Sequence, residues 1–216
     1  MDFFITAFEY FLHIDRHLGV LVESYGLLTY AIIFLIIFLE TGVILTPFLP
    51  GDSLIFAAGV LATVTILNPV WLFVIIFVAA VLGDTTNYWI GHVVGSKIFE
   101  KDRPFINENY LKRTQIFYEK HGKKTIILAR FIPIVRTFAP FVAGISKMQY
   151  GIFLTYNILG GLIWSGLFVF LGYFFGNLPI VKNNFGITVV IIIIVSMIPA
   201  FVEYWKSKRA KPESIK

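Results

Sequence analysis

The chain has 216 residues, of which 57% are hydrophobic and 14% are charged, and its net charge is +5. Soluble domains are closer to half apolar and a quarter charged, and a soluble core of this length cannot hide so much apolar surface. We therefore predict an integral membrane protein. The lack of cysteine excludes disulfides and thiolate metal sites. The basic residues lie between and after apolar segments, which indicates a membrane surface rather than nucleic acid as their partner.

The start of the chain mixes apolar residues with charged ones such as Asp2 and Glu9. This pattern favours an amphipathic helix lying in the membrane interface, although a short helix packed on the others fits it equally well. Asp2 stands where a signal peptide carries Lys or Arg, so no cleaved targeting segment is predicted. We assign residues 1–24 to this helix, 25–206 to the membrane domain and 207–216 to a basic tail.

Two apolar segments, 25–67 and 125–147, are each broken by two prolines. Proline ends or kinks a helix, and the arms on either side of each break are shorter than the roughly 20 residues that cross a bilayer. Such a break predicts a re-entrant helical hairpin, which must lie inside protein or line water. Two ordinary short helices joined outside the membrane are the alternative.

Three further segments, 69–94, 150–176 and 186–204, are predicted to be full transmembrane spans of this all-α fold. Each half of the chain has a proline-broken hairpin followed by a glycine-bearing span, which indicates an inverted repeat. The loop 97–124 and the C-terminal tail are basic and are therefore predicted to be cytoplasmic. The two hairpins then enter from opposite faces, and their breaks meet near the middle of the membrane.

Four ionisable residues lie at the two breaks: Glu40, Asp52, Arg130 and Arg136. A charge at bilayer depth costs about 2.5–3.5 kcal/mol, which makes these residues functional candidates. Guanidinium forks suit bidentate binding of phosphate, so Arg130 and Arg136 are predicted to bind an anionic substrate headgroup. Glu40 and Asp52 are predicted to neutralise the arginines without substrate and to exchange protons. Structural ion pairs, with Asp52 capping the helix that begins at Ser53, are the alternative.

Four other residues are predicted to line the same cavity: Asp84, Tyr88, Asn157 and Trp164. Asp84 and Tyr88 lie one helical turn apart on one face, although a salt bridge from Asp84 to the basic loop fits as well. A lone histidine, His92, is weak evidence for a metal. We see no nucleophile–base arrangement, so we predict no enzyme, no cofactor and no metal site.

Four motifs follow one another between residues 25 and 176: Glu40 with Pro47-x-x-Pro50-Gly51-Asp52, Gly83-Asp84-x-x-x-Tyr88-x-x-Gly91-x-x-x-Gly95, Arg130-Phe131-x-Pro133-x-x-Arg136-Thr137, and Gly144-x-x-x-Met148. Together they resemble the signatures of the DedA family, also called the SNARE-associated or VTT-domain group. The resemblance implies a protein of the bacterial plasma (inner) membrane. It also implies that the positions matching Glu40, Asp52, Arg130 and Arg136 are the functional ones.

Members of that family are linked to moving lipid headgroups across the bilayer, notably undecaprenyl phosphate and phosphatidylethanolamine, and to proton-motive-force homeostasis. We therefore expect a flippase for a phosphate-bearing lipid such as undecaprenyl phosphate, with coupled protons and no nucleic-acid partner. The alternative is a proton-coupled transporter of a small solute or cation, in which the acids matter more than the arginines. A third hypothesis is a non-transporting assembly factor, whose function would survive neutralisation of the four charges.

Overall fold

The computed structural model describes residues 22, 24–42, 51–98, 114, 116, 118–183 and 188. Its elements are all helical: α3 (Leu27–Gly42), α4 (Gly51–Leu61), α5 (Pro69–Ile98), η1 (Gly122–Lys124), α7 (Thr125–Ala129), α8 (Pro133–Ile145), α9 (Tyr150–Gly176) and α10 (Pro179–Asn183). The predicted all-α class is therefore confirmed for this part of the chain. The expected interfacial helix and basic tail, and the span 186–204 apart from Thr188, lie outside the described residues.

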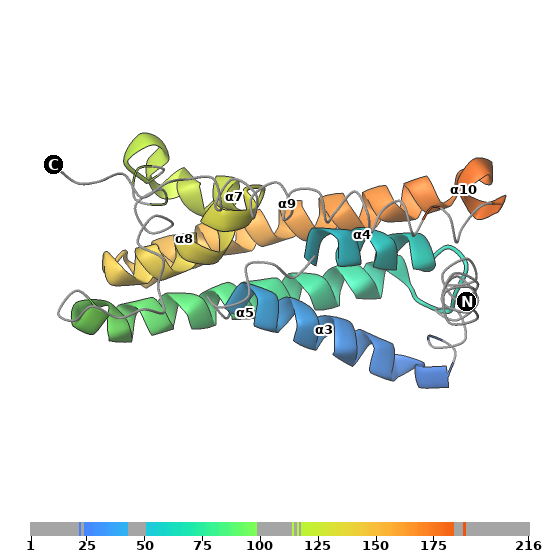
Figure 1. The fold of residues 1–216 in the computed structure, drawn as a ribbon, viewed down its shortest axis with the longest axis horizontal. Coiled ribbons are helices and arrows are strands. Elements are labelled where there is room, and N and C mark those ends of the chain that lie inside the picture. The colour runs from blue at the N-terminus through green and yellow to red at the C-terminus, as the bar shows by residue number, and fades with distance from the viewer. Residues whose placement is uncertain are drawn as a thin grey trace, which may run out of the picture.

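Two long helices, α5 and α9, run antiparallel through the length of the molecule (Figure 1). The stretches Pro69–Val93 and Tyr150–Gly176 are long and apolar enough to cross a membrane. At a rise of about 1.5 Å per residue, each exceeds the roughly 30 Å of a bilayer's hydrocarbon core. Only 33% of each apolar stretch is buried inside the protein, so most of its apolar surface faces outward.

The start of α5 is set by local chemistry. Asn68 precedes the helix, and its Oδ1 accepts hydrogen bonds from the backbone N–H groups of Val70 at 2.8 Å and Trp71 at 3.3 Å. Pro69 is the first helical residue, where a missing N–H costs nothing. The Asn68 N–H in turn donates to the hydroxyl of Tyr30 at 2.7 Å. This bond fixes the beginning of α5 to α3.

The shorter helices enter from opposite ends of the long pair (Figure 1). The helix α3 runs inward from the end where α5 begins, and α4 leads back toward that end. From the other end, α7 runs inward and α8 leads back out. The helices α3 and α8 pack on α5, whereas α4 and α7 pack on α9. With 16, 11 and 13 residues, α3, α4 and α8 are each too short to cross a bilayer.

Proline sets the break between α7 and α8, as the sequence predicts. Pro133 is the first residue of α8, and the preceding Ile132 is extended, with φ −122° and ψ 106°. A residue before proline is driven out of the helical region, so the helix must stop there. The helix α4 begins at Gly51 rather than at Ser53, which puts Asp52 inside the first turn instead of at the cap.

Glycines allow the short helices to approach the long ones closely. A Cβ at Gly91 of α5 would overlap the carbonyl oxygen of Phe141 in α8, and one at Gly172 of α9 would overlap that of Phe56 in α4. Such contacts between backbones are typical of helix packing in membranes. They hold α4 and α8 against the long helices with little freedom to shift.

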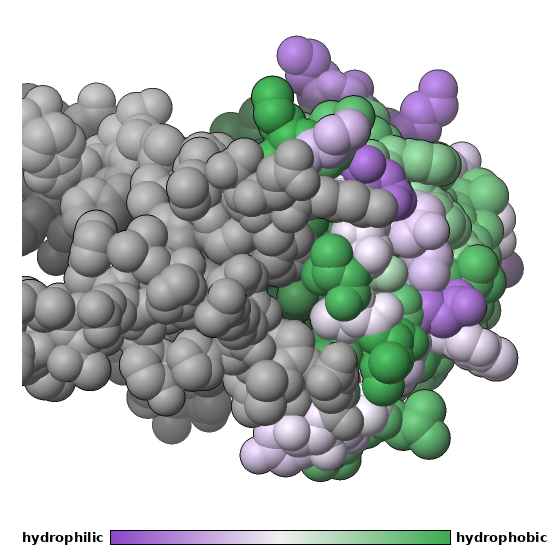
Figure 2. Space-filling view, turned by 90° about the vertical axis from the view of Figure 1, so that its right-hand side faces the viewer, coloured by the Kyte–Doolittle hydropathy of each residue, from purple (hydrophilic) through white to green (hydrophobic). Residues whose placement is uncertain are grey.

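The end at which α3 and α5 begin is apolar and faces the viewer in Figure 2, where hydrophobic side chains reach the surface between more polar ones. A groove of about 580 Å³ opens there, lined by Gly26, Leu27, Tyr30, Ile66, Asn68, Trp71 and Ile75. Trp71 is 62% exposed. Exposed tryptophan with an apolar surround is typical of a membrane interface.

Candidate substrate-binding site

Arg136 joins three helices at the inner ends of the short pairs. It lies in the first turn of α8 and is buried. Its Nη1 donates to Oδ1 of Asp52 in α4 at 2.5 Å, and its Nη2 donates to Oε1 of Glu40 in α3. Glu40 is fully buried, whereas the Asp52 side chain keeps 35% of its surface exposed. Asp52 is therefore the acid of this group that solvent can reach.

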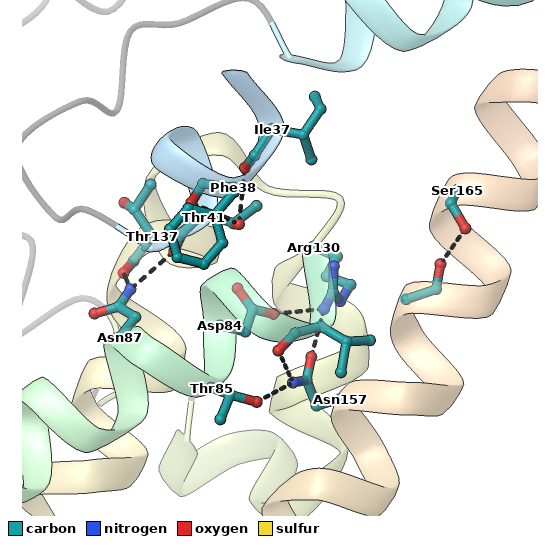
Figure 3. Close-up of polar contacts among 12 residues, drawn as sticks. Ile37, Phe38, Thr41, Asp84, Thr85, Asn87, Arg130, Thr137, Asn157 and Ser165 are labelled. Carbon is teal, nitrogen blue, oxygen red and sulfur yellow. Dashed lines mark hydrogen bonds and ion pairs between the residues drawn. The ribbon is translucent and has the colours of Figure 1, made fainter. Parts of the chain in front are cut away.

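Arg130 forms a second buried ion pair, with a different acid. It lies in the turn between α7 and α8, and its Nη2 donates to Oδ2 of Asp84 in α5 at 2.5 Å (Figure 3). The same Nη2 donates to Oδ1 of Asn157 in α9 at 2.5 Å. The Asn157 amide nitrogen donates to the carbonyl of Val81 at 3.1 Å, which keeps its oxygen turned toward Arg130.

Trp164 of α9 connects the two ion pairs. Its Nε1 donates to Oδ1 of Asp52 at 3.0 Å, the oxygen that also accepts from Arg136. The guanidinium carbons of Arg130 and Arg136 lie 5.8 Å and 5.2 Å from its ring centre. Both distances are within the range of cation–π attraction. One fully buried indole thus stabilises both arginines.

Several polar atoms of the group have no hydrogen-bond partner within the described part of the chain. They are Arg130 Nε and Nη1, Arg136 Nε, Glu40 Oε2, Asp84 Oδ1 and Asn87 Oδ1. A buried donor without a partner costs about 1–3 kcal/mol, so each one in a folded protein calls for a reason. The arginine donors are those that an added anion would satisfy.

Two helix N-termini point at the same group. The helix α4 begins beside Glu40, because a Cβ on Gly51 would overlap the Glu40 carboxylate. The helix α8 begins three residues before Arg136, and its N-cap residue Ile132 makes no capping hydrogen bond from its side chain. Helix N-termini carry partial positive charge and free N–H groups, which favour anions. Together with the unpaired arginine donors, they form a site suited to an anion.

Asn87 holds the inner ends of α3 and α8 together, and the sequence analysis did not single it out. Its amide nitrogen donates to the carbonyl of Thr41 at 3.3 Å and to that of Thr137 at 2.8 Å (Figure 3). It is fully buried in α5. The available signal was a polar run, residues 84–87, inside an otherwise apolar span.

The structure therefore brings seven of the eight predicted residues into one group. Glu40, Asp52 and Arg136 meet directly, and Arg130 meets Asp84, Asn157 and Trp164. Tyr88 lies elsewhere: its hydroxyl donates to the carbonyl of Met148 at 2.5 Å, and its ring stacks on Phe153 with centroids 4.5 Å apart.

Metal binding finds no support in this part of the chain, since no three His, Asp or Glu residues among those described are grouped to hold an ion. His92 lies exposed near the end of α5.

Comparison with known proteins identifies the family. The VTT domain profile matches residues 49–174. Over the full length of both chains, the sequence is 50% identical to Protein DedA of Escherichia coli strain K12. The chain belongs to the DedA family. The resemblance predicted from the four motifs is thereby confirmed.

Other DedA-family relatives are named as membrane proteins. An uncharacterized membrane protein of Mycobacterium leprae is 42% identical, over 84% of this chain and 82% of the relative. Inner membrane protein YqjA of Escherichia coli strain K12 is 29% identical, over 83% of this chain and 85% of the relative. No solved structure matches the chain. These names agree with a bacterial inner-membrane protein, whereas the cytoplasmic position of the C-terminus stays a prediction.

Proposed function

We propose that this DedA-family protein is a flippase that moves a phosphate-bearing lipid, such as undecaprenyl phosphate, between the leaflets of the membrane. The observation that carries the proposal is the pair of buried arginines with spare N–H donors, Arg130 and Arg136, beside two helix N-termini. A phosphate offers several acceptor oxygens, and guanidinium forks bind them bidentately. In this role the two arginines bind the headgroup.

Charge balance ties headgroup binding to protons. Three carboxylates (Glu40, Asp52 and Asp84) face two guanidiniums, so the fully ionised group carries a net charge of −1. An anionic headgroup entering this group would meet net repulsion, and the arginines are already engaged. Protonation of the acids removes both obstacles. Glu40 and Asp52 are the coupling acids of the proposal, and the partial exposure of Asp52 supplies a route for protons.

The arrangement of the helices supports an inverted repeat of α3–α5 and α7–α9. In each unit the first short helix packs on the long helix of its own unit, and the second packs on that of the other. Gly91 and Gly172 both lie 22 residues after the first residue of their long helix. Each contacts the second short helix of the other unit, at Phe141 and Phe56. Two re-entrant hairpins entering from opposite faces would bring the charged group to the middle of the membrane.

The outer surface suits the hydrocarbon tails of such a lipid. Leu162, Leu167 and Leu171 of α9 are 39%, 43% and 50% exposed, while the charged groups lie inside. This polarity is the reverse of that in a soluble bundle and matches a protein surrounded by lipid. A headgroup can then occupy the polar interior while its tail stays in the bilayer.

Leaflet exchange in liposomes tests the proposal. Purified protein is reconstituted with fluorescent polyprenyl phosphate, and exchange is followed with and without a pH gradient for wild type, Arg130→Ala and Arg136→Ala. The matched control is Lys123→Ala, which removes an exposed positive charge in η1. The proposal expects exchange by wild type and the control, and loss in both arginine variants. Equal exchange in all four proteins would refute the headgroup site.

The excess of carboxylates favours one further candidate, a proton-coupled transporter of a small solute or cation. In that case proton movement measured with a pH-sensitive dye would continue in liposomes free of polyprenyl phosphate. Glu40→Gln and Asp52→Asn would then abolish it, while Arg130→Ala would have the smaller effect. Dependence of proton movement on polyprenyl phosphate would exclude this candidate.

A further inference from the structure

The five charges form two separate units rather than one network. Arg136 contacts Glu40 and Asp52, and Arg130 contacts Asp84. Among the described residues, Asp84 is the one acid within salt-bridge distance of Arg130. Protonating Glu40 and Asp52 would therefore release Arg136 and leave Arg130 held.

We propose that Asp84 is a second proton-coupling carboxylate, which holds Arg130 in the absence of a headgroup and releases it on taking up a proton. This inference rests on the proposed function and deepens it. Each arginine then has its own acid switch, and binding of one phosphate headgroup requires proton uptake at both units.

Burial makes the switch steep. Asp84 is 2% exposed, and its Oδ1 has no hydrogen-bond partner in the described part of the chain. If Arg130 turned to a phosphate while Asp84 stayed ionised, a buried carboxylate would lose its main compensating charge. Uptake of a proton at Asp84 removes that cost. Loss of the proton restores the ion pair and expels the headgroup.

Asn157 allows Arg130 to change partners without losing every contact. Its oxygen accepts from Arg130 Nη2, and its amide nitrogen is held by the Val81 carbonyl. This neutral acceptor stays in place whether Asp84 is protonated or not. The Nε and Nη1 groups of Arg130 are unpaired among the described residues and are free to bind phosphate oxygens.

Other titratable groups surround Asp84, and any test must separate them. Glu40 from α3, Arg136 from α8, Arg130 from the α7–α8 turn and Tyr118 from the segment before η1 all lie within its electrostatic reach. Asp52 of α4 faces Arg136 instead. Variants that neutralise one acid at a time are therefore needed.

Calorimetric proton counting tests the inference. Farnesyl phosphate is titrated into the purified full chain in detergent, in buffers of different ionisation enthalpy, which gives the protons taken up per bound phosphate. Asp84→Asn should bind with about one proton fewer than wild type. The matched control Glu119→Gln removes an exposed acid and should leave the count unchanged. The phosphate's own protonation contributes equally to every protein.

An equal count in wild type and Asp84→Asn would overturn the inference while leaving the proposed function intact. Failure of wild type to bind farnesyl phosphate would instead refute the proposed function, and this inference with it. If Asp84→Asn does not fold, Asp84→Glu provides the second test. The infrared band of the carboxyl protonated on phosphate binding should shift in Asp84→Glu and not in Glu119→Gln, and an unshifted band would also overturn the inference.

Discussion

The indole N–H of Trp164 donates to the carboxylate oxygen of Asp52 that also accepts from Arg136, across 112 residues of sequence. The contact ties α9 to the first turn of α4 at the point where solvent reaches the charged group. Trp164 therefore fixes the orientation of the most exposed acid.

Replacing Trp164 with phenylalanine keeps an aromatic ring and removes this bond. We expect Trp164→Phe to lower the free energy of unfolding in detergent by about 1–3 kcal/mol, because a hydrogen bond to a charged group is lost. Trp71→Phe, at a 62% exposed position, is the control and should change it little. Similar losses in both variants would count against the role of the bond.

Arg136→Lys keeps the charge and removes the fork. A lysine ammonium cannot make two parallel in-plane bonds, so Glu40 and Asp52 would no longer be joined by one side chain. We expect lipid exchange to fall about 10- to 100-fold, equivalent to one charged hydrogen bond. Lys123→Arg is the reciprocal exposed control. Wild-type exchange by Arg136→Lys would show that charge alone suffices.

Asn87→Ala should loosen the inner ends of α3 and α8. It removes the hydrogen bonds to Thr41 and Thr137 and leaves both carbonyls buried, so we expect a loss of about 1–3 kcal/mol in unfolding free energy. The control is Thr86→Ala, one residue away, whose hydroxyl bonds only within its own helix at Leu82. If both variants unfold alike, the link between helices is not important for stability.

Two glycines of α9 make a matched pair for the packing of α4. A Cβ at Gly172 would overlap the Phe56 carbonyl, whereas one at Gly166 would meet only the Phe73 ring at 3.5 Å. We expect Gly172→Ala to destabilise the protein by about 1–3 kcal/mol. Gly166→Ala should be neutral or slightly stabilising, because alanine favours a helix. Thermal unfolding in detergent compares the two directly.

The sequence predicted the meeting of Glu40 and Asp52 with Arg136 for a physical reason. Charges at bilayer depth must find partners, and proline breaks place both sets at the inner ends of short helices. The break at Pro133 was equally readable, since the residue before proline leaves the helical region. These features are local in the chain or follow from the cost of burying charge.

The pairing of Arg130 with Asp84 could not be read in the same way. It depends on the height at which α5 passes the turn between α7 and α8, and helix packing in apolar sequence leaves that height undetermined. Asp84 and Tyr88 share a helix face, but one turn displaces them by about 6 Å along the axis. That displacement puts Asp84 beside Arg130 and Tyr88 beside Met148.

The most direct test of the central claim compares two lipids that differ only in the headgroup. Leaflet exchange of a fluorescent polyprenyl phosphate and of the matching uncharged polyprenol is measured for wild type and for the double variant Arg130→Gln, Arg136→Gln. We predict that wild type accelerates exchange of the phosphate and not of the polyprenol, and that the double variant accelerates neither. Acceleration of both lipids by wild type, or of the phosphate by the double variant, would contradict a headgroup site built on these arginines.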